Sequence, residues 1–169
     1  MSYIEFKVIP LYFTKEKVLS APMPNTEYLL PPGTAGAVDH IGIAVRDLDE
    51  GIALYSGLLG LELERTEVVP QENIRVAFLK MGRESAVGHV ELLAPLSDEG
   101  NIARFIAKHG PGLHHIALAA TNIEEVMERC RAAGMRLLDE TPREGAGGKK
   151  IVFMHPKSGG GVLIEICSE

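Results

Sequence analysis

The sequence lacks the features that would place it in a membrane, in a disulfide-rich secreted class or on nucleic acid. It has no apolar run close to the roughly 20 residues that a membrane-spanning helix needs, so we expect no membrane span. Its two cysteines, Cys130 and Cys167, are too few for a disulfide framework, so we expect a cytoplasmic protein with both thiols in its core. Its formal net charge of -6 argues against general electrostatic binding to nucleic acid.

The overall amino-acid composition is typical of a globular protein. Hydrophobic residues make up 46% and charged residues 24% of the 169 positions, which is enough for a real hydrophobic core. The first 36 residues stand apart, because they hold five of the ten prolines and lie outside the pattern that organises the rest. We interpret residues 1–36 as an N-terminal extension, with a short strand at 3–9 followed by an extended segment without regular structure.

An internal repeat organises the remaining chain. Residues 38–47 and 112–121 share the same apolar alternation, the same small residues and a leading histidine, so that His40 falls on His115 at an offset of 75. Glu91 falls on Glu165 at an offset of 74, since one residue is lost between the copies. Two copies indicate a duplicated module rather than a solenoid array.

Each copy is predicted to form a strand, a helix and three further strands. In the first copy, we expect strands at 38–45, 61–68, 74–81 and 89–93, with a helix from the capping residue Asp47 to Gly60. In the second copy, we expect strands at 112–121, 135–139, 150–154 and 162–167, with a helix from the capping residue Asn122 to Gly134. A helix at about 100–109 links the copies. Asp47 and Asn122 are each followed three residues later by a glutamate, which is typical of a helix N-terminus.

These elements predict an α+β fold of tandem βαβββ modules, whose curved mixed sheet surrounds a metal-binding cavity. The expected boundaries are 1–36 for the N-terminal extension, 37–96 for the first module, 97–111 for the linking helix and 112–169 for the second module. One face of each sheet is covered by its helix, so the other faces must meet or close over a cavity.

Strand periodicity predicts which residues face that cavity. His40, Gly42 and Ala44 share one face of their strand, and His115, Ala117 and Ala119 share the matching face of the copy. The same alternation turns His114 toward the opposite face. On the helix of the first copy, the apolar stripe is expected at Ile52, Tyr55, Leu58 and Leu59. Small residues beside a histidine leave room for a ligand.

Two histidines and two glutamates at matching places predict a metal site. His40, His115, Glu91 and Glu165 would converge under a two-fold pseudo-axis, and a buried carboxylate without a partner would cost several kcal/mol. Imidazole and carboxylate ligands suit a divalent transition metal, and cobalt, manganese, nickel or zinc would each be accepted.

Several segments also carry a family resemblance. The sequence resembles the vicinal oxygen chelate superfamily at 39–45, 91–96, 107–115, 145–148, 153–158 and 161–165. Within that superfamily, the chain is most similar to the methylmalonyl-CoA epimerase family. The resemblance implies metal ligands at His40, Glu91, His115 and Glu165. It also implies an acyl-CoA substrate and a homodimer.

The activity that this resemblance implies is a 1,1-proton transfer at C2 of methylmalonyl-CoA, through a metal-stabilised enediolate. Glu165 and Glu91 are the expected proton carriers, one on each face of C2. Lys149, Lys150 and Lys157 are candidates for the coenzyme A phosphates. Some members of the family carry a catalytic glutamate where this chain has Val76, so that base is absent here.

Three other activities remain open at this point. Glyoxalase I (lactoylglutathione lyase) uses the same His-Glu-His-Glu set and also moves a proton. An extradiol dioxygenase would need Fe(II) held by two histidines and one carboxylate, so a second glutamate disfavours it. A drug-binding module of the same superfamily would not need four metal ligands, so bound metal in the purified protein would count against it.

Overall fold

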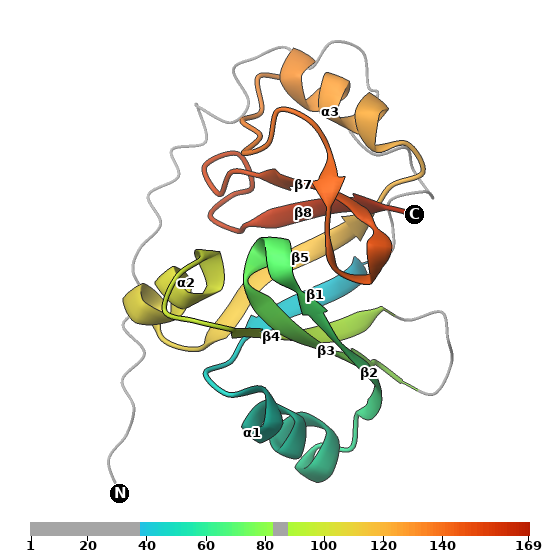
Figure 1. The fold of residues 1–169 in the computed structure, drawn as a ribbon. Helices are drawn as coiled ribbons and strands as arrows, with labels where there is room; N and C mark the ends of the chain where they lie inside the picture. The colour runs from blue at the N-terminus through green and yellow to red at the C-terminus, as the bar shows by residue number, and fades with distance from the viewer. Residues whose placement is uncertain (1–37, 83–87) are drawn as a thin grey trace, which may run out of the picture.

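One curved, mixed sheet of eight strands forms the centre of the molecule (Figure 1). The computed structural model describes residues 38–82 and 88–169, and the strands follow the order β2-β3-β4-β1-β5-β8-β7-β6. The α+β fold class and the curved mixed sheet predicted from the repeat are confirmed. The extension at 1–36, with its expected strand at 3–9, lies outside the described residues.

The elements follow the order that the repeat predicted, with short additions. In the first half they are β1 (Val38–Ala44), α1 (Leu48–Ile52), the π-helical turn η1 (Ala53–Leu58), β2 (Glu62–Val69), the 3-10 turn η2 (Pro70–Glu72), β3 (Ile74–Lys80) and β4 (His89–Pro95). Helix α2 (Asn101–His109) links the halves. In the second half they are β5 (Gly112–Ala119), α3 (Ile123–Ala132), β6 (Arg143–Glu144), the 3-10 turn η3 (Ala146–Gly148), β7 (Lys150–Met154) and β8 (Ile164–Ser168).

Strands β1 and β5 join the two halves in antiparallel pairing at the middle of the sheet. His40 lies opposite Ala117, and Gly42 lies opposite His115, so the pairing is reciprocal about a pseudo-two-fold axis. Each central strand then pairs in parallel with the last strand of its own half. The register confirms the repeat.

The sheet separates two helix-covered outer faces from one inner face. On the α1 side, Ile43 and Val45 pack with the buried Leu48, Leu79 and Leu92. Helix α3 covers the other outer face, where the predicted stripe of Ile123, Val126, Met127 and Cys130 is buried as expected. Helix α2 instead packs against the inner face of the first half, together with Ala44 and Leu93. The predicted phase of β1 and β4 is therefore confirmed.

The helix of the first half departs from its expected stripe. Its Asp47 cap forms as predicted, with the carboxylate accepting a hydrogen bond from the Glu50 N–H at 2.9 Å. After Ile52, however, the helix changes to π-helical hydrogen bonding, with the Leu59 N–H donating to the Leu54 carbonyl. The wider turn rotates the following residues, so Leu58 is 81% and Leu59 is 60% exposed. The prediction that both would pack inward was wrong.

The strand expected at 135–139 is also absent from the described structure. Only an isolated bridge joins Leu137 to Met154, and the two-residue β6 takes the edge of the sheet instead. Asp139 explains the interruption, because its carboxylate accepts the Phe153 N–H at 2.8 Å. A side chain thus replaces the backbone ladder at this point.

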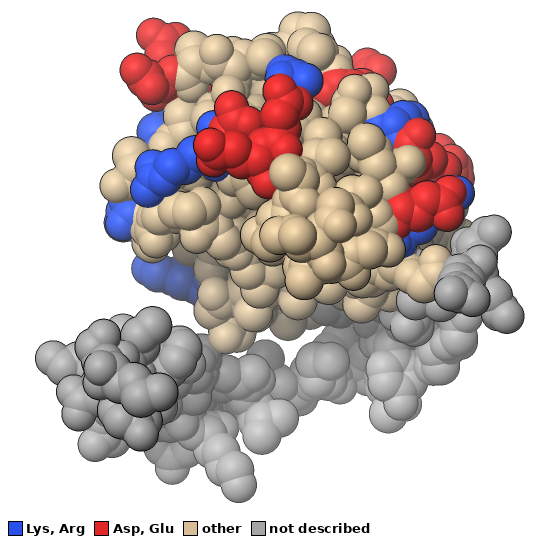
Figure 2. Space-filling model, turned by 90° about the horizontal axis from the view of Figure 1, so that it is seen from below, with Lys and Arg blue, Asp and Glu red and all other residues tan. Residues whose placement is uncertain are grey.

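The end of the molecule beyond α1 presents a mixed surface. Viewed from that side, a broad uncharged area is bordered by acidic and basic side chains (Figure 2). Within the described part of the chain, no helix is long and apolar enough to cross a bilayer.

The cluster beneath α1 gives a test of the fold. Leu92 is fully buried in β4, so Leu92→Ala should lower the free energy of unfolding by about 2–5 kcal/mol through a residual cavity. Leu58→Ala removes the same atoms from an 81% exposed position and should change stability by less than about 0.5 kcal/mol. Urea denaturation of both variants measures the contrast, and equal losses would contradict this packing.

Candidate active site

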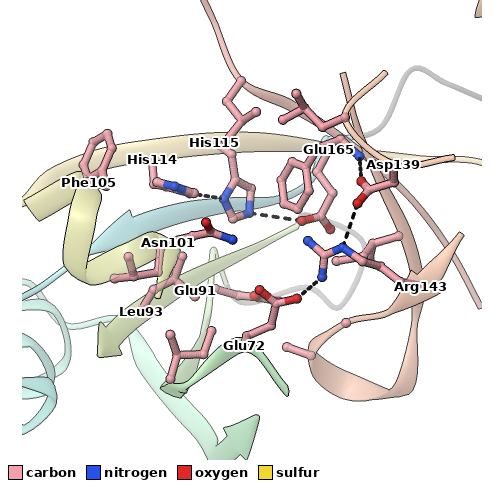
Figure 3. A pocket seen from close by; sticks show the side chains of 18 of the residues that line it. Glu72, Glu91, Leu93, Asn101, Phe105, His114, His115, Asp139, Arg143 and Glu165 are labelled. Atoms are coloured by element: carbon pink, nitrogen blue, oxygen red, sulfur yellow. Dashed lines mark hydrogen bonds and ion pairs between the residues drawn. The ribbon is translucent and has the colours of Figure 1, made fainter. Parts of the chain in front are cut away.

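A cavity of about 750 Å³ opens between the two halves on the inner face of the sheet. The four predicted residues line it and are all buried: His40, Glu91, His115 and Glu165 are 4%, 7%, 4% and 4% exposed. Figure 3 shows Glu91, His115 and Glu165 directed into this space from three strands. The sheet therefore brings together residues that lie up to 125 positions apart in the sequence.

Three of the four form a compact group of possible metal ligands. The Nε2 atoms of His40 and His115 lie 3.1 Å apart. Glu165 places one carboxylate oxygen 3.6 Å from the first and the other 3.5 Å from the second. These atoms lie within 4.8 Å of one another, and two imidazoles with a carboxylate suit a divalent transition metal.

Glu91 lies on the other side of the His40 ring. Its Oε1 is 3.6 Å from His40 Nδ1, not from the Nε2 that faces Glu165. Glu91 is therefore close to the group of three but is not part of it.

Gly42 makes the room that the His115 ring occupies. A Cβ atom at Gly42 would stand 2.2 Å from Cε1 of His115, far inside van der Waals contact. The prediction that small residues leave room for a ligand is wrong at Gly42, because the His115 ring fills the space there.

His114 lies in the same cavity as His115, which corrects the prediction that it faces away. The β1–β5 register passes from Gly42 opposite His115 to Ile43 opposite Leu113, so His114 is the extra residue of a β-bulge. A bulge interrupts the alternation of side chains and turns consecutive residues toward one side. The Nδ1 atoms of His114 and His115 are 2.8 Å apart, as the dashed line in Figure 3 indicates.

A second chain of hydrogen bonds runs from His40 through Asp39 to Lys149. His40 Nδ1 lies 2.8 Å from one carboxylate oxygen of Asp39, and the other oxygen accepts a hydrogen bond from Lys149 Nζ at 2.6 Å. Lys149, one of the three lysines proposed for the coenzyme A phosphates, lines the cavity, and its ammonium group is engaged by Asp39.

The two other predicted lysines do not line the main cavity. Lys150 pairs with Glu124 at 3.3 Å, where both side chains are more than half exposed. Lys157 lies on the surface, and its backbone N–H donates to the His155 ring.

A cluster that the sequence did not predict crosses the cavity between the halves. Arg143 forms an ion pair with Glu72 of the first half, and its Nε donates to Asp139 at 3.1 Å (Figure 3). No motif or spacing singled out Arg143, because its partners lie on irregular segments on both sides of the cavity.

Burial sets the electrostatics of the candidate ligands. Desolvation raises the pKa of Glu165 to about 7, and it also raises the pKa of Glu91. Desolvation, with the neighbouring His40 charge, holds the pKa of His115 well below its usual range, which favours the neutral ring that a metal requires. Burial opposes the charged form of His40, but the Asp39 hydrogen bond and the nearby glutamates outweigh it and raise its pKa.

Comparison with known proteins identifies the family. A profile of the glyoxalase/bleomycin resistance protein/dioxygenase superfamily matches residues 39–153. The chain therefore belongs to this superfamily, also called the vicinal oxygen chelate superfamily.

Within this superfamily, the chain is similar to several individual proteins. The human mitochondrial methylmalonyl-CoA epimerase is 35% identical over 78% of this chain and 73% of its own length. The uncharacterized protein YqjC of Bacillus subtilis is 37% identical over 77% of this chain and 90% of its own. A variant of Streptomyces coelicolor methylmalonyl-CoA epimerase, solved in complex with 2-nitronate-propionyl-CoA, superposes with a TM-score of 0.75. It is 35% identical and covers 80% of this chain and 98% of its own. The predicted resemblance to methylmalonyl-CoA epimerases is confirmed.

The contact between Gly42 and His115 gives a direct test of the site. Gly42→Ala should displace the His115 ring and destabilise the protein by about 1–3 kcal/mol through overpacking. Gly57→Ala is the matched control, because a Cβ there meets nothing within 4 Å. Thermal unfolding and the ring NMR signals of His115 report the two effects. An unmoved ring in Gly42→Ala would contradict the described register.

The raised pKa of Glu165 predicts a pH-dependent stability in chelator-treated protein. Since burial raises this pKa from 4.5 to about 7, the folded state binds the proton more tightly than the unfolded state. The resulting stabilisation is fully present below about pH 4.5 and is lost as the pH rises through 7. Relative to Glu165→Gln, the wild-type free energy of unfolding should fall by about 3 kcal/mol over that window.

Urea titrations at pH 4.5, 6 and 8 measure this difference. The exposed Glu128→Gln should keep the wild-type pH dependence. Parallel curves for wild type and Glu165→Gln would show that Glu165 does not titrate in this window.

Proposed function

We propose that this chain catalyses the metal-dependent epimerisation of methylmalonyl-CoA at C2 by 1,1-proton transfer. The observation that carries the proposal is the convergence of His40, His115 and Glu165 in a cavity large enough for an acyl thioester. The likeness to epimerases, one of them solved with a propionyl-CoA analogue, supports the substrate class.

The residues present fit a divalent transition metal. His40 and His115 would hold it through their Nε2 atoms and Glu165 through its carboxylate, with Glu91 as the predicted fourth ligand. When bound, such an ion acts as a Lewis acid toward the substrate oxygens. Cobalt, manganese, nickel and zinc all remain candidates.

Glu165 and Glu91 are the proposed proton carriers. Inversion at C2 needs one proton carrier on each face of the planar carbon. The two carboxylates enter the cavity from β8 and β4, in opposite halves of the sheet. Burial raises the pKa of both glutamates toward the range in which a carboxyl group both accepts and returns a proton near neutrality.

The environment of Val76 supports the choice of Glu91. Val76 is fully buried in β3 and packs in an apolar cluster with Leu93 and Phe78, so this position supplies no base. Glu91 lies opposite Phe78 on the neighbouring strand and is the carboxylate of the first half that faces His40. The homodimer predicted from the resemblance remains part of this proposal.

A racemisation assay tests the activity. Purified protein loaded separately with cobalt, manganese, nickel or zinc should interconvert the C2 epimers of methylmalonyl-CoA, and chelator should abolish the reaction. The glutathione adduct of methylglyoxal, offered in parallel, should remain unchanged. Turnover of that adduct alone would establish lactoylglutathione lyase activity instead.

Glu165→Gln separates proton transfer from metal binding. The amide keeps an oxygen for the metal but cannot carry a proton at neutral pH, so turnover should fall by about 10²–10⁴-fold. Exchange of the C2 proton with deuterated solvent should persist from one epimer and vanish from the other.

Each epimer is therefore assayed separately with metal-saturated enzyme. Glu128→Gln, on the exposed face of α3, should exchange both epimers at the wild-type rate. If Glu165→Gln also exchanges both, the base lies elsewhere in the cavity.

A further inference from the structure

We propose that Asp39 and His114 are positioning residues, each fixing the ring orientation and tautomer of the metal-binding histidine that follows it. Both occupy the same place in the internal repeat, one residue before His40 and one residue before His115. The inference rests on the metal centre of the proposed function, but it does not depend on which substrate that centre serves.

The direction of each ring follows from its nitrogen partners. The Nε2 atoms of His40 and His115 face each other at 3.1 Å, and both face Glu165. A histidine that binds a metal through Nε2 must carry its proton on Nδ1. The question for each ring is therefore which group accepts the Nδ1 proton, because that group selects the tautomer.

For His40 the acceptor is the carboxylate of Asp39. The Nδ1 atom lies 2.8 Å from Oδ1 of Asp39, while Oδ2 accepts from Lys149 at 2.6 Å. The Asp39 side chain is 18% and that of Lys149 is 24% exposed, so both charges are largely withdrawn from water. Lys149 therefore holds the Asp39 carboxylate in the orientation that accepts the hydrogen bond from His40 Nδ1–H.

For His115 the acceptor is the ring of His114. The two Nδ1 atoms are 2.8 Å apart, so one nitrogen must donate and the other must accept. With the His115 proton on Nδ1, His114 accepts through Nδ1 and carries its own proton on Nε2. Phe105 holds the His114 ring edge-on at 4.8 Å between centroids.

Irregular strand pairing makes both contacts possible. In a regular strand, the residue before each histidine would turn to the opposite face of the sheet. The β1–β5 register shifts between Val38 and His40 and again between Gly42 and Ile43, so Asp39 and His114 are the extra residues of two bulges. A bulge re-aims the side chain of its extra residue. The two halves therefore use the same backbone device with different side chains.

The two partners differ in charge, and this predicts unequal effects. An imidazole whose Nδ1–H donates to a carboxylate gives more electron density to a metal on Nε2 than one whose Nδ1–H donates to a neutral ring. Loss of an outer partner commonly lowers metal affinity by about 10–100-fold. We expect Asp39→Ala to lie toward the upper end of that range and His114→Phe toward the lower end.

His114→Phe is the sharper variant, because phenylalanine keeps an aromatic ring against Phe105 and removes the ring nitrogens, including the acceptor. His109→Phe is its matched control. His109 also stacks on Phe105, with ring centroids 5.1 Å apart, but its ring is not bonded to that of His115. Cobalt affinity, measured by competition with a chromophoric chelator, should fall for His114→Phe and stay at the wild-type value for His109→Phe.

Proton NMR of the cobalt-loaded protein supplies a readout that a purely structural role would not change. Wild-type protein should show two exchangeable, paramagnetically shifted signals, one from each Nδ1–H. His114→Phe should speed solvent exchange of one signal, and Asp39→Ala should do so for the other. Asp39→Asn and His114→Gln each keep an acceptor oxygen, and each should recover part of the lost affinity.

The outcomes separate the two proposals. Wild-type affinity and unchanged exchange in both His114→Phe and Asp39→Ala would overturn the positioning roles, as would a wild-type protein that binds no cobalt. If His114→Phe fails to fold, the solvent exchange of the His115 Nδ1–H signal in His114→Gln decides whether His114 positions His115. A wild type that binds cobalt but does not epimerise methylmalonyl-CoA would overturn the proposed function alone, and the variant comparison would still decide the positioning roles.

Discussion

The antiparallel contact between β1 and β5 is the constraint on which the site depends. Neither half contains both His40 and His115, and the two rings meet only where these strands pair. Because His40 meets Ala117 while Gly42 meets His115, each half supplies one imidazole and one small residue to the other. A slip of β5 by one residue against β1 would turn the His115 ring to the helix-covered face and separate it from His40 and Glu165.

The apolar clusters that stabilise the fold are separate from the ionisable residues that line the cavity. The two outer faces of the sheet carry the apolar clusters beneath α1 and α3, where residues such as Leu92 and Met127 are almost completely buried, and a third apolar cluster lies beneath α2 on the inner face of the first half. The inner face also carries four buried ionisable side chains, and burying these opposes folding because each charge loses water. The three apolar clusters must offset that cost.

The sequence was sufficient to predict the features that depend on the internal repeat or on the alternation of residues along a strand. The offset between copies identified His40 with His115 and Glu91 with Glu165, and strand periodicity assigned Ala44 to the inner face, because these patterns are local. It could not identify what arises only when distant segments meet. The bulge at His114 follows from the register of two strands, and the engagement of Lys149 depends on Asp39, 110 positions away. The π-helical turn that exposes Leu58 is likewise a change of geometry without a distinct sequence pattern.

The same reasoning explains why the two halves are similar without being identical. A duplicated module gives both histidines the same backbone position, and in each half the preceding residue is the extra residue of a bulge. The side chain at that residue is free to differ, because the bulge and not the side chain sets its direction. The first half places a carboxylate against His40, and the second half places an imidazole against His115. Pseudo-symmetry of the backbone therefore does not extend to the hydrogen-bond partners of the two histidine rings, since one partner is a carboxylate and the other is a neutral ring.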